Sequence, residues 1–326
     1  MNVRYLTGFE SSNAFVLVQP DEVVLVTDGR YGEAARAVEG VDVQIVERDF
    51  LPGVATRVGE VVRGPVGFES DHLTVARHAE LVTTGVDLFP LTAVPLTLRA
   101  VKEPEELDAI RRAAQIVDRV LARLARERVV GRTEADVAWW IVQAIHEEGA
   151  DDISFAPIVG SGPNAALPHH HPGDRQLGAG ETVVVDLGAR VDGYCSDCTR
   201  TFATGELPEG LREAYAVCHG AQAAALAEVR AGADTRGLDA IARMEIEAAG
   251  QVVLHGLGHG VGLEVHELPV LRPTAAGTLA AGNVVTVEPG VYLAGQGGVR
   301  IEDLVVVTDD GAEVLSSYTK DLVTLN

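Results

Sequence analysis

Residues 181–202 read ETVVVDLGARVDGYCSDCTRTF, a pattern that predicts a strand, a turn at Val191–Gly193 and a returning strand. Folding the stretch just after Val191 places Asp186 opposite Asp197. Like charges that oppose each other directly across neighbouring strands destabilise a sheet. The hairpin therefore requires something that compensates its two acids.

Residues 283–308, NVVTVEPGVYLAGQGGVRIEDLVVVT, predict a second strand pair, and folding about Gly295 places Glu288 opposite Glu302. Neither hairpin offers a cation that matches both pairs of acids, and burying an isolated carboxylate is very costly. A single acid in a hairpin is usually exposed to solvent, but the apolar runs around Asp186 and Glu288 indicate burial. These runs therefore predict a metal site.

Residues 255–267, HGLGHGVGLEVHE, place three histidines in a glycine-rich segment. Carboxylates and an imidazole suit manganese, cobalt, iron or zinc, and five such ligands, two of them bridging, fit a two-metal centre. HELP lacks the second histidine of a zincin motif, and Val261 breaks the glycine pattern of a dinucleotide-binding loop. We expect the glycines to let the backbone approach the metals and the substrate closely.

The helical patterns along the chain repeat. Long amphipathic helices are predicted at about 104–128, with Pro104 in the first turn, and at about 209–230. Each is followed by a shorter helix bracketed by glycines at the same spacing, within 131–149 and 232–250. Each shorter helix precedes β-rich sequence, which indicates two structurally related halves.

Residues 1–100 predict a small mixed domain, so that the chain as a whole is α/β (α+β). Its short β-rich runs, bounded by Gly, Pro and Asp, lie at 13–20, 22–29, 41–47 and 64–69. The character of the sequence changes near 98–103, where we place the domain boundary.

The composition excludes several classes of partner. The chain of 326 residues carries 26 Lys and Arg against 48 Asp and Glu, a formal charge of −22 that repels nucleic acids and anionic membranes. Three cysteines do not make a disulfide framework, and we expect small buried or half-buried thiols. With no secretory signal pattern at the N-terminus, these features predict a cytoplasmic protein.

The motifs VVVDLG, SDCTRTF, HGLGHGVGLEVHE, TVEPGVY and RIED together resemble the pita-bread (M24-type) metallopeptidases. The resemblance is to the Xaa-Pro aminopeptidases and the related Xaa-Pro dipeptidases (prolidases), covers 103–326, and includes SGPNA and ALPHHHP. It implies a pseudo-twofold catalytic domain at 101–326. NVRYLTGF is similar to the creatinase-like small domain of these peptidases, which implies that 1–100 is such a domain, shortened at its start.

The resemblance also implies roles for individual residues. The metal ligands are Asp186, Asp197, His259, Glu288 and Glu302. His169 and His266 contact the substrate and stabilise the transition state, His255 lines the pocket, and Glu288 also moves the proton. Tyr292 and Arg300 orient the ligands. His170 and His171 match no such position and are interpreted as loop residues.

The implied activity is that of an Xaa-Pro aminopeptidase, which releases the N-terminal residue from peptides with proline second. Its nucleophile is a hydroxide activated by two divalent ions, manganese first and cobalt or zinc as alternatives. The expected partners are such peptides and a second copy in a homodimer, and no nucleic acid or membrane.

Two alternatives remain open. A prolidase usually carries an arginine-bearing insertion before its EPG motif. Here the interval between His266 and Glu288 is short and Arg272 is its only arginine, which favours the aminopeptidase. A non-catalytic pita-bread protein, or a metal-free relative acting on amidino compounds, is expected to lose metal ligands, whereas this chain retains all five. Methionine aminopeptidases share the ligands but usually lack the small domain and the ALPH and HELP contexts.

Overall fold

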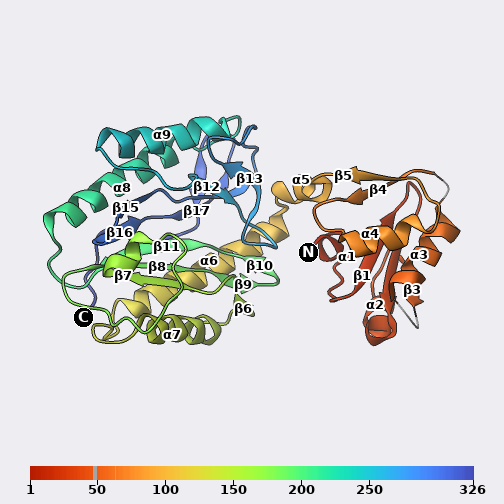
Figure 1. Ribbon diagram of the computed structural model, residues 1–326, viewed down its shortest axis with the longest axis horizontal. Coiled ribbons are helices and arrows are strands. Elements are labelled where there is room, and N and C mark those ends of the chain that lie inside the picture. Colours follow the sequence, from red (N-terminus) through yellow and green to blue (C-terminus); the bar gives the residue numbers. More distant parts are fainter. Residues whose placement is uncertain (47–49, 63) are drawn as a thin grey trace. The chain divides into compact units, whose positions relative to one another are not determined.

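The computed structural model describes residues 1–46, 50–62 and 64–326 (Figure 1). These residues divide into two compact units, Met1–Arg99 and Ala100–Asn326. None of the helices in the described ranges combines the length and the apolar character that crossing a membrane needs.

The first unit is a small α/β unit. Its elements are α1 (Asn2–Thr7), β1 (Ala14–Val18), β2 (Val23–Asp28), α2 (Gly32–Arg36), β3 (Asp42–Val46), α3 (Phe50–Val61), β4 (Val66–Glu69), α4 (Val75–Val82), β5 (Leu88–Leu91) and α5 (Val94–Ala100). Antiparallel β1 and parallel β3 flank β2, and β4 pairs with β5 in parallel. Val24 and Val26 of β2 pack on one face of the sheet and Leu25 packs on the other, so its apolar run is buried on both sides.

All four predicted strands of this unit are present, although Glu47, at the end of one predicted run, lies outside the described residues. The strand β5 was not predicted. Its sequence, LFPL, is short and contains Pro90, a residue that lacks the N–H a strand normally donates.

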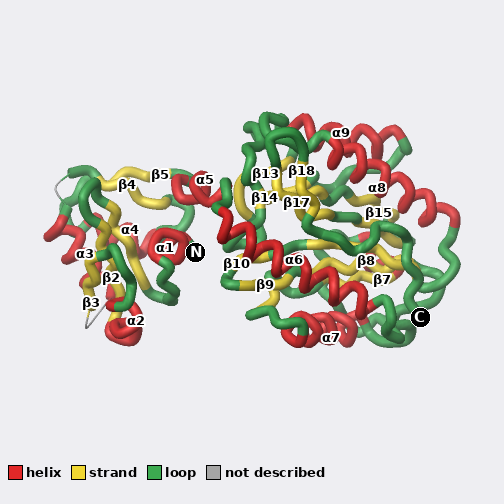
Figure 2. Tube along the Cα trace, turned by 180° about the vertical axis from the view of Figure 1, so that it is seen from behind, coloured by secondary structure: helices red, strands yellow, loops and turns green. Residues whose placement is uncertain are grey.

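Four long helices cover the strands of the second unit. They are α6 (Pro104–Leu124), α7 (Glu134–Glu147), α8 (Glu209–Ala227) and α9 (Thr235–Ala248). In Figure 1, α8 and α9 lie above the strands and α7 lies below them; the view from behind in Figure 2 shows α6 running along the strands. α6 contacts β9 (Ala189–Val191) and β10 (Tyr194–Cys195), and α7 contacts β7 (Ile158–Ser161).

The remaining strands form the sheets that carry the sequence motifs. One sheet has the order β11 (Cys198–Ala203), β8 (Thr182–Leu187), β7, and a short one the order β10, β9, β6 (Asp152–Ile153). A larger sheet has the order β13 (Glu267–Leu271), β12 (Gly258–Gly260), β14 (Val284–Val287), β17 (Asp303–Val307), β18 (Ala312–Val314). β15 (Gly290–Leu293) pairs with β16 (Gly297–Arg300).

The internal repeat predicted from the helices is present in the hydrogen bonding. The Gly131 amide donates to the Leu177 carbonyl and the Gly232 amide to the Leu279 carbonyl, each at 2.8 Å. Equivalent isolated bridges follow, Thr133 with Gln176 and Asp234 with Thr278. The two helix pairs are therefore attached to their sheets in the same way.

Two helices end earlier than the sequence predicted. α6 ends at Leu124 rather than near 128, and α8 ends at Ala227 rather than near 230. After α6 the chain turns so that Val129 is buried and its amide donates to the Asn326 carbonyl at 2.7 Å. A tertiary contact with the far end of the chain thus replaces the last helical turn.

The alternation of β8 positions the site. Val183, Val185 and Leu187 lie in the core beneath α6 and α7. Because successive side chains of a strand point to opposite faces, Asp186 faces away from that core. Ile301 likewise lies in the core beneath α8, which turns the adjacent Glu302 the other way.

Candidate metal centre

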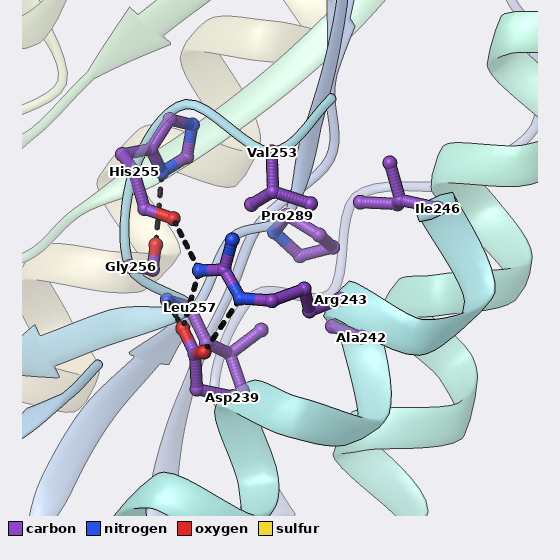
Figure 3. A pocket seen from close by; sticks show the side chains of 9 residues that line it. All are labelled: Asp239, Ala242, Arg243, Ile246, Val253, His255, Gly256, Leu257 and Pro289. Carbon is purple, nitrogen blue, oxygen red and sulfur yellow. Dashed lines mark hydrogen bonds and ion pairs between the residues drawn. The ribbon is translucent and has the colours of Figure 1, made fainter. Parts of the chain in front are cut away.

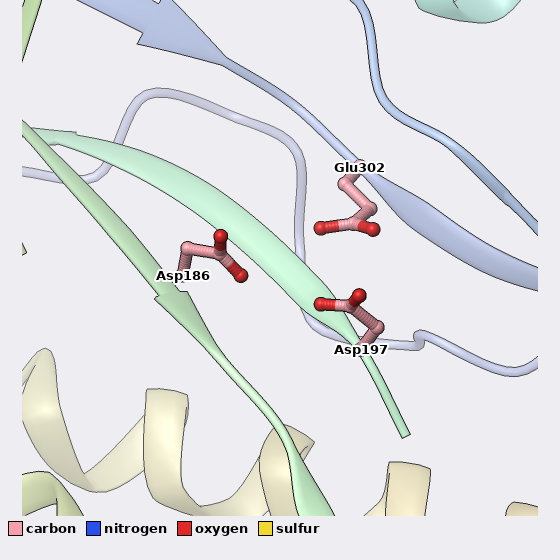
Figure 4. Close-up of side chains that lie close together, drawn as sticks. All are labelled: Asp186, Asp197 and Glu302. Carbon is pink, nitrogen blue, oxygen red and sulfur yellow. The ribbon is translucent and has the colours of Figure 1, made fainter. Parts of the chain in front are cut away.

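Three buried carboxylates from separate segments meet in the second unit. Asp186 lies on β8, Asp197 directly before β11, and Glu302 between β16 and β17. Each offers one oxygen atom, and these atoms lie within 4.8 Å of one another. Figure 4 shows the three side chains pointing toward one another.

A histidine and a fourth acid complete this cluster. Nε2 of His259, on β12, lies 3.2 Å from Oε1 of Glu288 and 3.6 Å from Oδ2 of Asp197. Nδ1 of the same ring donates to the Gly260 carbonyl at 3.0 Å, which leaves Nε2 as the atom with the lone pair in the neutral ring. The structure thus brings together all five residues that the resemblance implied as ligands.

The register predicted for the first hairpin is wrong. Asp186 pairs with Thr199 rather than Asp197, and the turn consists of Asp192 and Gly193, both with positive φ (48° and 78°). A two-residue turn of type I′ has positive φ at both residues and favours Asp-Gly, so the fold point lies one residue later than expected. Asp197 reaches the site from the irregular step between β10 and β11.

The register predicted for the second hairpin is confirmed. Folding about Gly295 pairs Val287 with Asp303 and Gly290 with Arg300, the pairs that the structure contains. Glu288 and Glu302 occupy the step between these two pairs.

Arg300 supplies one buried positive charge. Its Nη2 donates to Oδ2 of Asp186 at 2.6 Å, its Nη1 to the hydroxyl of Tyr292 at 3.2 Å, and its Nε to Oγ1 of Thr199 at 3.1 Å. Thr199 in turn donates to Oε2 of Glu302 at 2.8 Å. One oxygen of Asp186 and one of Glu302 are thereby fixed in place.

The other oxygens of these two acids have no such partner. Oδ1 of Asp186 and Oε1 of Glu302 are buried, and no hydrogen bond reaches them from the part of the chain that the structure describes. Metal ligands are typically held in this way, with one oxygen oriented by a neighbour and the other directed at the ion. The donor set and its unpaired oxygens therefore fit divalent cations.

The pKa values in the cluster show that Arg300 and His259 supply too little positive charge for four acids. Burial and the neighbouring acids raise the pKa of Asp197 and of Glu302 well above their usual values. Burial also opposes ionisation of Glu288, but the hydrogen bond and charge of His259 outweigh it and lower the pKa of Glu288 to about 2. The four acids need further cations before all of them ionise.

His255 and Tyr292 are coupled to Arg300. Nδ1 of His255 donates to the Gly256 carbonyl and its Nε2 accepts from the Tyr292 hydroxyl, both at 2.8 Å. Burial lowers the pKa of His255, so the ring is neutral. A small cavity beside it is lined by α9, where Arg243 donates to Asp239 and to the His255 carbonyl (Figure 3).

His266 lies against His259, and His169 directly follows Pro168, whose carbonyl binds Arg300; both histidines are exposed. The rings of His259 and His266 have centroids 4.3 Å apart at an interplanar angle of 70°. Burial and the neighbouring charges of His259 and His169 lower the pKa of His266. The carbonyl of Pro168, the residue before His169, accepts a hydrogen bond from Nη1 of Arg300 at 3.0 Å.

The sequence did not predict a role for some residues near the site. Thr199 orients Glu302, and its position on a strand face two residues from Asp197 is a signal that could have revealed it. His170, interpreted as a loop residue, lies in a loop but contacts the buried Glu134 at 2.7 Å. Glu134 looked like an ordinary acid in the first turn of a helix, and its partners on the loop are far away in sequence.

The glycines of the histidine segment serve the packing of strands. A Cβ at Gly258 would collide with the Thr286 carbonyl, and one at Gly260 with the Leu268 carbonyl. They let β12 approach its neighbours in the sheet. Their expected role in letting the backbone approach the metals and the substrate stays a prediction. The three cysteines are buried and free, as predicted.

Comparisons with known proteins agree with this geometry. The model of metallopeptidase family M24 matches residues 108–309, and that of the creatinase/prolidase N-terminal domain matches residues 1–101. The probable dipeptidase PepE of Mycobacterium tuberculosis is 41% identical over 253 residues, which are 76% of this chain and 67% of that protein.

Solved structures match over nearly the whole chain. The Xaa-Pro dipeptidase from Bacillus anthracis has 34% identity and a TM-score of 0.95, over 99% of this chain and 92% of that one. The X-Pro aminopeptidase from Thermotoga maritima has 30% identity and a TM-score of 0.90, over 99% and 93%. The chain therefore belongs to metallopeptidase family M24, and it is a pita-bread hydrolase of the exopeptidase type.

Proposed function

We propose that the protein is an Xaa-Pro dipeptidase (prolidase). The observation that carries the peptidase chemistry is the convergence of Asp186, Asp197, His259, Glu288 and Glu302, with buried oxygens that no described donor satisfies. The sequence favoured an aminopeptidase. We reverse that order because the compared dipeptidase exceeds the compared aminopeptidase in both identity and TM-score.

The five residues would hold two divalent ions. Manganese is our first choice because carboxylate oxygens dominate the donor set, and cobalt or zinc are alternatives. When bound, such ions polarise a carbonyl and make water a nucleophile near neutral pH.

The chain's own residues would position the substrate and move its proton. Glu288, whose lowered pKa keeps it ionised, accepts the proton of the attacking water and passes it to the proline nitrogen. His266 donates a hydrogen bond to the developing oxyanion, and His169 and His255 contact the substrate. Tyr292 and Arg300 hold His255 and Asp186 in place.

An X-Pro bond has no N–H, and proline fixes the φ of its residue. A site shaped for this bond can therefore exclude ordinary peptides.

A comparison of an X-Pro dipeptide with the matching X-Pro-X tripeptide tests the substrate class. We expect turnover of the dipeptide and little turnover of the tripeptide by the metal-loaded protein. Preference for the tripeptide establishes the second candidate, an Xaa-Pro aminopeptidase, which the short segment with Arg272 as its only arginine favours. An X-Ala dipeptide is the control for proline specificity.

The proposal extends to the setting of the enzyme. Free buried cysteines support a reducing compartment such as the cytoplasm, and the family resemblance implies a homodimer. Sedimentation of the purified protein tests the dimer. Removal of the metal by a chelator should abolish hydrolysis and its return restore it, whereas a binding protein would gain no activity.

A further inference from the structure

A buried carboxylate outside the metal centre holds the loop that carries His169. Glu134 begins α7, and its side chain is completely buried. Its oxygens accept from the Ser161 amide and hydroxyl at 2.8 and 2.7 Å, from Asn164 Nδ2 at 3.1 Å, and contact His170 Nε2 at 2.7 Å. All of these partners lie in the segment 161–173.

These hydrogen bonds keep the acid charged. Burial opposes ionisation, but the bonds from Ser161 and His170 outweigh it and lower the pKa of Glu134. Bonds to an ionised carboxylate are about twice as strong as those between neutral groups. The segment is therefore fixed by a charged side chain that contacts none of the five proposed ligands in these hydrogen bonds.

The fold of α7 does not require this acid. The repeat places Thr235 at the equivalent first position of α9, since Glu134 and Thr235 each donate their amide to a carbonyl of the returning segment, at 2.9 and 3.1 Å. Threonine begins that helix without a buried charge. Glu134 therefore serves the loop of its own half.

The other end of the loop is held at the metal centre. The Pro168 carbonyl accepts from Arg300, which also donates to Asp186. His169 is thus placed between two fixed neighbours, Pro168 on Arg300 and His170 on Glu134.

We propose that Glu134 and His170 are positioning residues, which act on the reaction by holding His169 where it meets the substrate. This inference rests on the proposed function, because it assigns a supporting structure to the same site.

A double-mutant cycle tests it. We expect His170→Ala to lower kcat/KM about 10-fold, the scale typical of residues that orient a site through another group. The matched control is His171→Ala, an exposed neighbour in the same loop, for which we expect no change. In a His169→Ala background, His170→Ala should have no further effect, and metal content should stay the same in every variant.

Equal behaviour of His170→Ala and His171→Ala, or effects of His169→Ala and His170→Ala that simply multiply, would overturn the inference. Hydrogen exchange gives a readout without activity: Glu134→Gln should speed exchange in 161–173 while the later turns of α7 stay protected, and unchanged exchange contradicts the proposal. Wild-type protein that cleaves no X-Pro substrate overturns the proposed function and the role of His169 with it. An active wild type with independent mutations overturns the inference alone.

Discussion

Arg300 links Asp186, one of the proposed metal ligands, to Tyr292, which binds His255, and to the loop that carries His169, each through a single hydrogen bond. Its planar guanidinium reaches Asp186, Tyr292 and Pro168 at once, a geometry that a lysine ammonium cannot reproduce. The cluster therefore depends on the shape of this cation as well as on its charge.

Replacement of Arg300 by lysine should lower activity or metal affinity about 10- to 100-fold, because Asp186 and the Pro168 loop lose their common donor. Steady-state kinetics and metal titration measure this. Arg111→Lys is the control, since Arg111 pairs with Glu313 at the exposed surface. Equal kinetics of the two variants would refute the role of the guanidinium.

The family resemblance supplied the five residues that the structure brings together. The sequence by itself indicated a metal site, because acids within apolar runs, such as Asp186 and Glu288, are costly to bury unless a cation binds them. It failed where the contact depends on tertiary structure. Glu134 and His170 meet only after α7 and the loop fold together, and the pairing of Asp186 depended on a turn misplaced by one residue.

The strand β12 is the element that depends most on its glycines. Gly258 and Gly260 flank His259 and face the backbones of β14 and β13. A side chain at either glycine would push β12 away from a neighbouring strand, and this shift would also move the imidazole of His259.

Gly258→Ala should destabilise the protein and weaken metal binding, because the added Cβ meets the carbonyl of Thr286. Gly220→Ala is the matched change, since Gly220 is exposed within α8 with open space around it. It should stabilise the protein by about 0.5–1 kcal/mol, the cost of glycine in a helix. Thermal unfolding compares the two, and a Gly258→Ala variant as stable as Gly220→Ala would contradict this packing.

Elements with strong local signals were predicted well. α7 and α9 lie between the glycines that bracket them in the sequence, and local hydrogen bonds cap both helices, with Thr133 accepting from Asp136 and Asp234 from Gly237. The end of α6 and the short strand β5 were not, because the contact of Val129 with Asn326 and the parallel pairing with β4 decide them. Such non-local contacts leave no periodic pattern.

For the molecule as a whole, ionisation of the buried acids in the cluster costs stability when no metal is bound. The raised pKa values of Asp197 and Glu302 mean that the folded protein holds protons which the unfolded chain releases above the usual 3.8 and 4.5. Since the folded state binds more protons, stability falls as pH rises through this window. The raised pKa of His259, which hydrogen bonding to Glu288 lifts against the effect of burial, adds to the fall above pH 6.5.

Below pH 6.5 the lowered pKa values of His255 and His266 act in the opposite sense, because there the unfolded chain binds the additional protons. Above pH 6.5 the melting temperature of chelated protein should therefore decrease as pH rises, and the stabilisation by added manganese should grow over the same range. Calorimetry with and without metal measures both. Metal stabilisation that is independent of pH would contradict the charge account.

Elemental analysis after metal loading and desalting shows whether the five side chains hold a pair of divalent ions. Wild-type protein should retain about two manganese ions per chain, and Glu302→Gln, with circular dichroism that shows it folded, should retain fewer. No bound metal in the wild type, or equal content in the variant, would contradict the account.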